Sequence, residues 1–161
     1  MPIINVHFAG QGKLPDGKAV PVPPQAVLTQ RGPIVQVTVS VGQQIAAQVL
    51  QSGGVLPAPV SGLALIDTGA SVTCVDQDAA TQLQLPAIDV VQVASASHAA
   101  AEQNVYPIQV EVMGLPITVN APRAVGASLA AQGLLVLLGR DVLQHCVLVY
   151  NGPAGSISLS I

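Results

Sequence analysis

A strict alternation of apolar and polar residues over residues 34–41 is the feature that most constrains the fold. Valines at every second position are separated by Gln36, Thr38 and Ser40, which is the two-residue period of a half-buried β-strand. Further short apolar segments are bounded by glycine or proline. We expect strands near residues 3–8, 63–67, 88–94, 105–112, 115–120, 134–138, 147–150 and 156–161. Short strands separated by such turns are typical of an all-β, barrel-like fold.

One or two short helices are expected between these strands. Asp76 is placed to cap the first helix, whose buried face would be formed by Ala79, Ala80 and Leu83. Residues 140–145 favour a helical turn. The helical content of the predicted fold is therefore small.

Two long connections are predicted from their glycine and proline content. Residues 42–62 are expected to form a loop, with a helical turn or a strand extension near residues 45–50. Residues 121–133 are expected to form another loop.

Prolines concentrate near the N-terminus. Six of the 13 prolines lie within residues 1–33, and proline removes a backbone donor from a strand. We therefore expect a partly extended, proline-rich N-terminal arm over residues 1–33, with at most a short strand. A single domain is expected over residues 34–161, because a chain of 161 residues suits one hydrophobic core.

The composition argues against several function classes. Only 8% of the residues are charged, the formal net charge is −3, and no basic stripe is present, so nucleic-acid binding is not expected. Residues 32–66 are uncharged, but glutamines, glycines and prolines interrupt them, so a membrane-spanning helix is not expected either. The N-terminus has no basic region before an apolar one, which argues against a secretory signal and favours the cytoplasm.

The two cysteines do not form a disulfide framework. Cys74 and Cys146 each lie among apolar residues and are expected to be small buried thiols, with a bridge between them as the less favoured alternative. No cysteine or histidine pair has the spacing of a metal site. Neither a metal nor another cofactor is expected.

One carboxylate stands where a predicted buried strand breaks into a turn. Asp67 ends the apolar run Ala64-Leu65-Ile66 and is followed by Thr68 and Gly69. A second segment, residues 137–143, reads Leu-Leu-Gly-Arg-Asp-Val-Leu, an apolar strand that reaches a glycine and then a helical turn. In this order, with strands and a hairpin between them, the two segments resemble the retropepsin-like aspartic proteases.

The resemblance implies an all-β, closed acid-protease barrel and a symmetric homodimer. Hydrolysis by carboxylates needs two of them, one to take a proton from water and one to polarise the peptide carbonyl. The chain contains a single Asp-Thr-Gly triplet. Each subunit would therefore contribute one Asp67 across a two-fold axis.

The resemblance also implies roles for individual residues. Asp67 would be the catalytic carboxylate, and Thr68 would bond to the backbone of the partner subunit beneath the dyad. The backbone of Gly69 would line the peptide site. The remaining supporting residues that match the family by type are Ala70, Gly139 and Arg140.

Residues 95–101 occupy the place of the family's flap, the hairpin that closes over substrate. Unlike the usual flap, this one has no glycine between residues 85 and 113. Ser71 stands where retroviral enzymes often have an acid that pairs with the arginine, so Arg140 is expected to bond to backbone, to Asp141 or to another acid. Substrate contacts from the cleft and the flap are expected from Ser71, Cys74, Ser95, Ala96, Ser97 and His98.

Two functions remain open at this point. The first is an aspartic endopeptidase that hydrolyses a peptide or protein substrate with water activated by two Asp67 side chains at a homodimer interface. The second is a retropepsin-like binding or dimerisation module with little or no proteolytic activity, since a fold does not determine a function. The intact Asp-Thr-Gly triplet favours the enzyme, and the flap without glycine favours the module.

Overall fold

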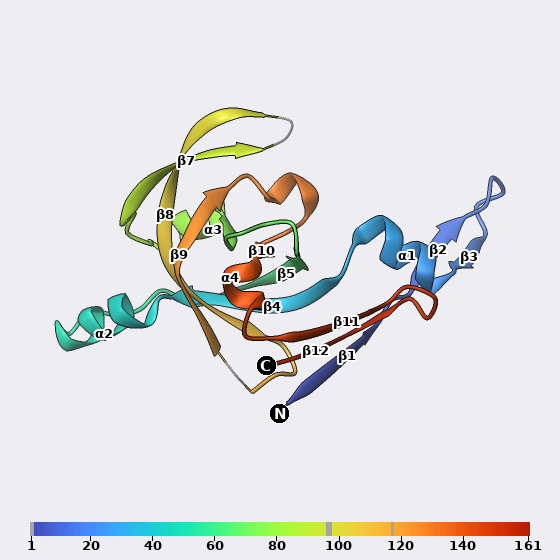
Figure 1. Ribbon diagram of the computed structural model, residues 1–161, viewed down its shortest axis with the longest axis horizontal. Coiled ribbons are helices and arrows are strands. Elements are labelled where there is room, and N and C mark those ends of the chain that lie inside the picture. The colour runs from blue at the N-terminus through green and yellow to red at the C-terminus, as the bar shows by residue number, and fades with distance from the viewer. Residues whose placement is uncertain (1, 96–97, 117) are drawn as a thin grey trace.

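The computed structural model describes residues 2–95, 98–116 and 118–161, and a β-barrel dominates this part of the chain (Figure 1). Its largest sheet has the strand order β4-β5-β10-β6-β9-β8-β7, and β4 also pairs with β8. That last pairing closes six strands into a ring, which confirms the predicted barrel. The seven strands are β4 (Ile34–Val41), β5 (Val60–Ile66), β6 (Cys74–Asp76), β7 (Asp89–Ser95), β8 (His98–Val112), β9 (Thr118–Ala127) and β10 (Val136–Leu138).

Small β-branched side chains fill the barrel. Strand β4 buries every second residue, as the alternation over residues 34–41 predicts. Val37, Val39, Val110 and Val136 are each fully buried in one continuous apolar core. Valine suits this role because its branched side chain packs well on a pleated surface.

Short helices lie between the strands. The cap at Asp76 is confirmed, since its carboxylate accepts hydrogen bonds from the backbone N–H groups of Asp78 and Ala79. The same buried carboxylate also accepts from Leu129 N and Ala130 N, each at 2.9 Å. Asp76 therefore connects the start of α3 to residues 129–130, which lie far away in the sequence. The helices are α1 (Pro24–Arg31), α2 (Gln43–Gln51), α3 (Gln77–Gln82) and α4 (Arg140–Leu143), with a 3₁₀ turn at Ala130–Gln132.

The expectation for residues 121–133 is wrong in its first half, because β9 continues to Ala127. Its pairing with β8 shifts register between Tyr106 and Ile108, which leaves Pro122 and Arg123 at an irregularity. Proline is tolerated at such a bulge because no ladder hydrogen bond is required of it there. Residues 121–127 therefore form the second half of β9, although a proline near their start is not typical of a strand.

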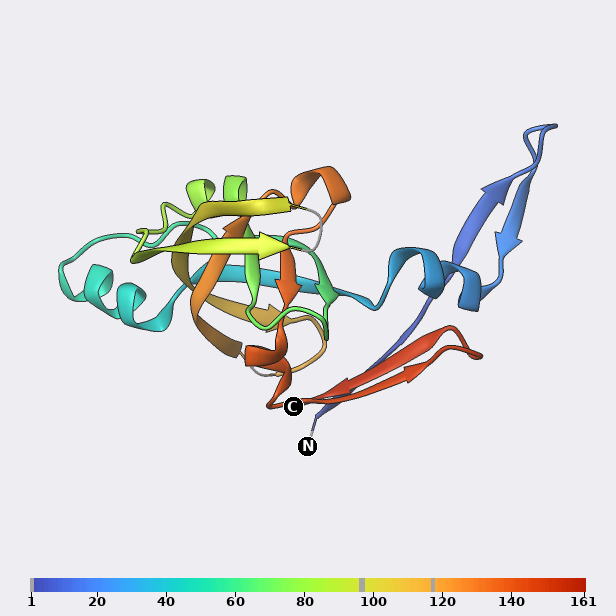
Figure 2. The same cartoon turned by 45° about the horizontal axis from the view of Figure 1, so that its top comes forward.

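The N-terminal arm contains more regular structure than its prolines predict. The strand expected near residues 3–8 is present as β1 (Ile3–His7), but a hairpin of β2 (Gly10–Lys13) and β3 (Ala19–Val22) follows it, and then α1. Pro24 occupies the first turn of α1, where the missing N–H has no helical partner to lose. Figure 2 shows this part projecting from the barrel.

The terminal strands pair with each other. β12 (Ser156–Ser160) lies between β1 and β11 (Val147–Asn151), and both pairings are antiparallel. Figures 1 and 2 place the two chain ends close together. Because β12 is already paired on both sides within one chain, a strand from a second copy could extend this three-stranded sheet only at the outer edge of β1 or β11.

None of the helices in the described part of the chain has the length and apolar character needed to cross a bilayer.

Candidate active site

Parallel pairing of β5 with β10 brings the two sequence motifs together. Leu65 is in register with Leu137, and Ile66 with Leu138, so both strands end at the same edge of the barrel. The backbone N–H of Asp67 continues the ladder by donating to the carbonyl of Leu138 at 3.0 Å. Asp67, which follows β5, therefore lies beside the glycine that follows β10.

The loop after β5 wraps around the carboxylate of Asp67. The N–H of Gly69 donates to its Oδ1 at 2.8 Å, and the N–H of Ala70 donates to the same atom at 3.3 Å. Asp67 is half-buried, whereas Thr68 and Gly69 are exposed. The carboxylate is thus held by its own turn while the outer edge of that turn faces solvent in a single chain.

Gly139 packs directly on the backbone that follows this loop. A Cβ atom at this position would lie 2.4 Å from the carbonyl carbon of Val72 and 2.7 Å from the nitrogen of Thr73. Only glycine permits this approach. The glycine of the second motif is therefore required by packing between two segments that lie far apart in the sequence.

Arg140 bonds to backbone, one of the three possibilities that the sequence left open. Its Nη1 donates to the carbonyl of Thr68 at 2.8 Å and to that of Gly69 at 3.0 Å. Its backbone N–H donates to the carbonyl of Ala70 at 3.0 Å. Three successive carbonyls of the loop after Asp67 are therefore held by one residue.

Asp141 and Thr73 form a second connection that sequence reasoning missed. The Thr73 hydroxyl donates to Asp141 Oδ1 at 2.8 Å, and the Thr73 N–H donates to Oδ2 at 3.1 Å. The hydroxyl oxygen in turn accepts from the N–H of Gly139 at 3.1 Å. The one available signal was the acid directly after the Gly-Arg pair.

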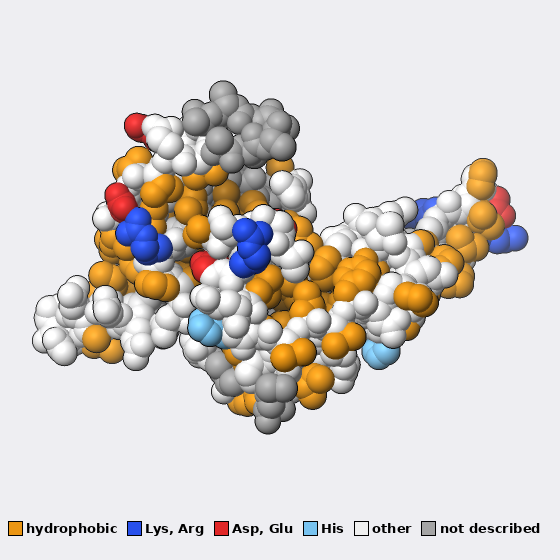
Figure 3. All heavy atoms as spheres, viewed as in Figure 1, with side chains coloured by type: hydrophobic (Ala, Val, Ile, Leu, Met, Phe, Trp, Pro, Cys, Tyr) orange, Lys and Arg blue, Asp and Glu red, His pale blue; other side chains and the backbone are white. Residues whose placement is uncertain are grey.

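The loop after β5 forms part of the wall of a cavity of about 1030 Å³. Valines of the hairpin β7–β8 and of β9 contribute much of its apolar wall, and several polar side chains interrupt that wall. Figure 3 shows hydrophobic, basic and acidic side chains close together on this side of the barrel. The lining residues that the sequence did not single out include Val91, Val93, Val105, Val125, Arg123 and Gln144.

The site residues predicted from the sequence divide into three groups. Asp67 lines the cavity together with Gly69, Ala70, Ser71 and Cys74. Thr68, Gly139 and Arg140 take part in the contacts around the loop described above. Of the expected flap residues, Ser95 and His98 face each other in the register of β7 and β8, while Ala96 and Ser97 lie outside the described residues.

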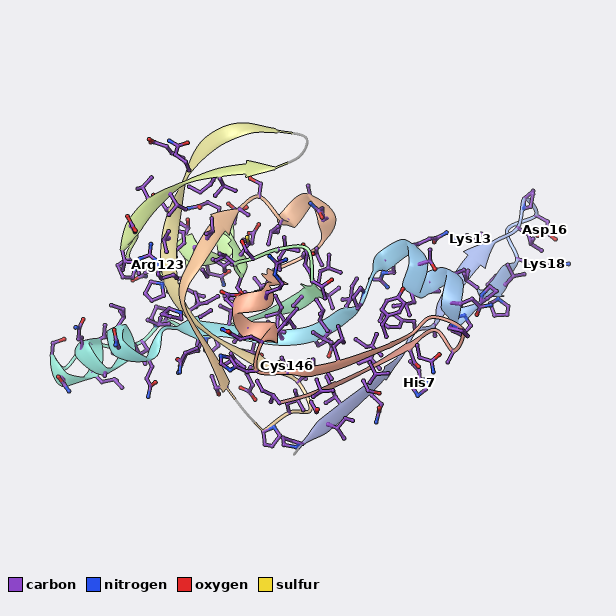
Figure 4. The ribbon with its side chains drawn as sticks, viewed as in Figure 1. His7, Lys13, Asp16, Lys18, Arg123 and Cys146 are labelled. Carbon is purple, nitrogen blue, oxygen red and sulfur yellow. The ribbon has the colours of Figure 1, made fainter. Side chains whose placement is uncertain are left out.

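An ion pair joins the start of the hairpin to β9. Arg123 Nη2 lies 2.5 Å from Asp89 Oδ2, and both side chains are about half exposed. Figure 4 shows Arg123 on the barrel, on the side away from the arm. The hydrogen bond from Arg123, supported by one from the N–H of Val90, holds the pKa of Asp89 below its usual value.

Both cysteines are free thiols. Burial raises the pKa of Cys74, and the negative charges of Asp141 and Asp67 raise it further. Burial also raises the pKa of Cys146. Each thiol is therefore protonated at neutral pH, and Cys74 reports on the charge of the carboxylates around it.

We expect Asp67→Asn to make Cys74 react with iodoacetamide at lower pH. Removing one of the nearby negative charges lowers the pKa of the thiol, and the thiolate is the reacting species. The measurement is the pH midpoint of alkylation in a Cys146→Ser background, with and without Asp67→Asn. The urea-unfolded protein supplies the reference and is expected to react at the lowest pH of the three. A midpoint that stays fixed or rises in Asp67→Asn would contradict the electrostatic effect of Asp67 on the Cys74 thiol.

The sequence model of one family, the gag-polyprotein putative aspartyl proteases, matches residues 60–145. This segment is more than half of the chain and contains both motifs. The chain belongs to this retropepsin-like family. No match to a curated protein was found by sequence.

Two solved structures are similar to this retropepsin-like chain at low identity. A retropepsin-like aspartic protease from Rickettsia conorii is 12% identical, with a TM-score of 0.45 over 98% of this chain and 90% of that one. The retroviral protease-like domain of Ddi1 from Leishmania major is also 12% identical, with a TM-score of 0.39 over 74% of this chain and 82% of that one. Both similarities are distant, and the family assignment rests on the sequence match.

Proposed function

We propose that the protein is an aspartic endopeptidase that works as a homodimer. The observation that carries this proposal is the carboxylate of Asp67, which is fixed by two backbone N–H groups and lines a cavity of about 1030 Å³. The cavity is large enough for several side chains of an extended peptide. Residues 34–161 would form the catalytic domain, and residues 1–33 would form its N-terminal arm.

The chemistry requires a second carboxylate, which a second copy of the chain would supply. Two aspartates a few ångström apart share one proton, because both cannot ionise together at low cost. The ionised one takes a proton from water as the water oxygen attacks the peptide carbonyl carbon. The protonated one donates a hydrogen bond to the carbonyl oxygen, and the C–N bond breaks as the amine nitrogen takes up a proton.

Incubation with a diverse peptide library tests the activity directly. We expect internal peptide bonds to be cleaved and a pepstatin-type inhibitor to block the cleavage. The alternative function, a binding or dimerisation module, is favoured by the hairpin that has no glycine between residues 85 and 113. A library left intact at every pH and at every protein concentration would favour the module.

Activity per chain is expected to fall steeply on dilution. A monomer has one Asp67, so the cleavage rate should follow the concentration of dimer rather than that of the chain. The measurement combines initial rates with sedimentation over the same concentration range. A monomeric protein with constant specific activity would rule out the shared site.

We expect Thr68→Ala to weaken the dimer more than Ser71→Ala does. Thr68 lies on the exposed edge of the turn and would bond across the interface, whereas Ser71 lines the cavity. Because the dimer is symmetric, the substitution removes two equivalent interfacial hydrogen bonds, which should raise the dimer dissociation constant roughly 10- to 100-fold. Ser71→Ala is the matched control, since it also removes one hydroxyl from the same loop. Equal dissociation constants for the two variants would argue against the role of Thr68.

A further inference from the structure

Two peptide groups lie between the guanidinium of Arg140 and the carboxylate of Asp67. The first joins Thr68 to Gly69. Its carbonyl accepts from Arg140 Nη1 at 2.8 Å, and its N–H donates to Asp67 Oδ1 at 2.8 Å. The second joins Gly69 to Ala70, with a carbonyl that accepts from the same Nη1 at 3.0 Å and an N–H that donates to the same Oδ1 at 3.3 Å.

This arrangement aligns two peptide dipoles between opposite charges. A guanidinium stays charged throughout the working pH range, and hydrogen bonds in a chain polarise one another. An N–H whose carbonyl is bound to a cation is therefore a stronger donor to a carboxylate. Because one Nη1 binds both carbonyls, it also fixes the planes of the two peptide groups relative to each other.

The position of Arg140 is itself fixed by the fold. Its backbone N–H donates to the carbonyl of Ala70, and the preceding residue, Gly139, packs on the backbone of Val72. The backbone of Arg140 is therefore held rigidly beside the loop whose carbonyls its guanidinium binds.

We propose that Arg140 is a positioning residue that orients the carboxylate of Asp67 through the two peptide groups on either side of Gly69. This inference rests on the proposed function for its effect on catalysis, although its effect on the loop does not depend on activity. The role differs from that of an arginine that pairs with an acid or contacts substrate. In this chain the guanidinium acts on the carboxylate of Asp67 indirectly, by binding the carbonyls of Thr68 and Gly69.

Kinetics of Arg140→Met and Arg140→Lys provide the first test. Methionine keeps an apolar stem but removes every donor, while lysine keeps the charge and can still donate to a carbonyl. We expect kcat to fall about 10- to 100-fold in Arg140→Met with KM within about twofold, because small misplacements of a reacting group have effects of this size. Arg140→Lys should recover part of the loss. The control is Arg31→Met, which removes one positive charge from α1 and should leave both constants unchanged.

Amide NMR spectra provide the second test and need no catalysis. In Arg140→Met the amide protons of Gly69 and Ala70 should shift upfield, since their hydrogen bonds to Asp67 weaken, and Arg140→Lys should lie between Arg140→Met and the wild type. If Arg140→Met does not fold, Arg140→Lys alone decides, by an intermediate shift and a reduced kcat.

The outcomes of the two tests separate this inference from the proposed function. A wild-type protein that cleaves no peptide would refute the proposed function. The amide shifts would still support or overturn the link from Arg140 to Asp67 through the two peptide groups. Unchanged amide shifts at Gly69 and Ala70 in both variants would overturn it. A wild-type value of kcat in Arg140→Met would overturn its catalytic role.

Discussion

Asp67→Asn is expected to reduce peptide cleavage by about 10³-fold or more while leaving the fold intact. The lost function is general acid–base catalysis, whose contribution is of order 10²–10⁴-fold, and in a homodimer the substitution removes both carboxylates at once. The fold should survive because the asparagine side-chain oxygen can still accept hydrogen bonds from the N–H groups of Gly69 and Ala70. The measurements are kcat/KM on a peptide found in the library and the midpoint of thermal unfolding.

Asp78→Asn is the matched control for this substitution. Asp78 is exposed on α3 and makes no contribution to the cavity described above, so both its activity and its unfolding midpoint should match the wild type. Near wild-type cleavage by Asp67→Asn would remove the basis of the proposed function. A variant that is inactive because it has unfolded would be recognised by its thermal midpoint.

Much of the barrel could be predicted because its strands follow local rules. Residues 34–41 show the period of a half-buried strand, and β4 has those bounds. Asp76 could be predicted as a helix cap because an acid before a small-residue helix is a local signal. The second role of Asp76, which binds the N–H groups at residues 129–130, depends on a tertiary contact that no local pattern encodes.

Where the predicted secondary structure differs from the fold, proline is the cause. The proline content of residues 1–33 argues against regular structure, whereas the fold has a hairpin over residues 10–22 and helix α1 there. In the fold these prolines occupy a turn, an edge strand and the first turn of a helix, where proline removes no needed donor. Strand β9 extends beyond the predicted strand end at residue 120, because Pro122 stands at a bulge where a strand tolerates proline.

The candidate site was predicted in part. The motif identified Asp67 and its neighbours, because a carboxylate at a strand end followed by Thr-Gly is visible in the sequence. The network of Thr73 and Asp141 was missed because the two residues are 68 positions apart and meet only when β5 and β10 pair in parallel. The valines that line the cavity were visible as strand residues, but the direction in which they face depends on barrel closure.

Gly139→Ala is expected to destabilise the protein by about 3 kcal/mol or more, at the upper end of the cost of overpacking a well-packed interior. The added methyl group would lie 2.4 Å from the carbonyl carbon of Val72 and 2.6 Å from its oxygen, so backbone rather than a mobile side chain would have to move. That movement would also stretch the hydrogen bond from the N–H of Gly139 to the hydroxyl of Thr73. The measurement is the free energy of unfolding in urea.

Gly152→Ala is the matched control, because the nearest atom to its added methyl group, Tyr150 Cε1, is 3.5 Å away, an ordinary contact distance. Its free energy of unfolding should lie within about 0.5 kcal/mol of the wild type. The same movement at Gly139 would displace Arg140 and weaken its hydrogen bonds to the loop after Asp67. Any folded Gly139→Ala protein should therefore also have a lower kcat. A Gly139→Ala protein as stable and as active as Gly152→Ala would mean that the second motif does not pack on the first, and that the link between the two motifs does not position Asp67.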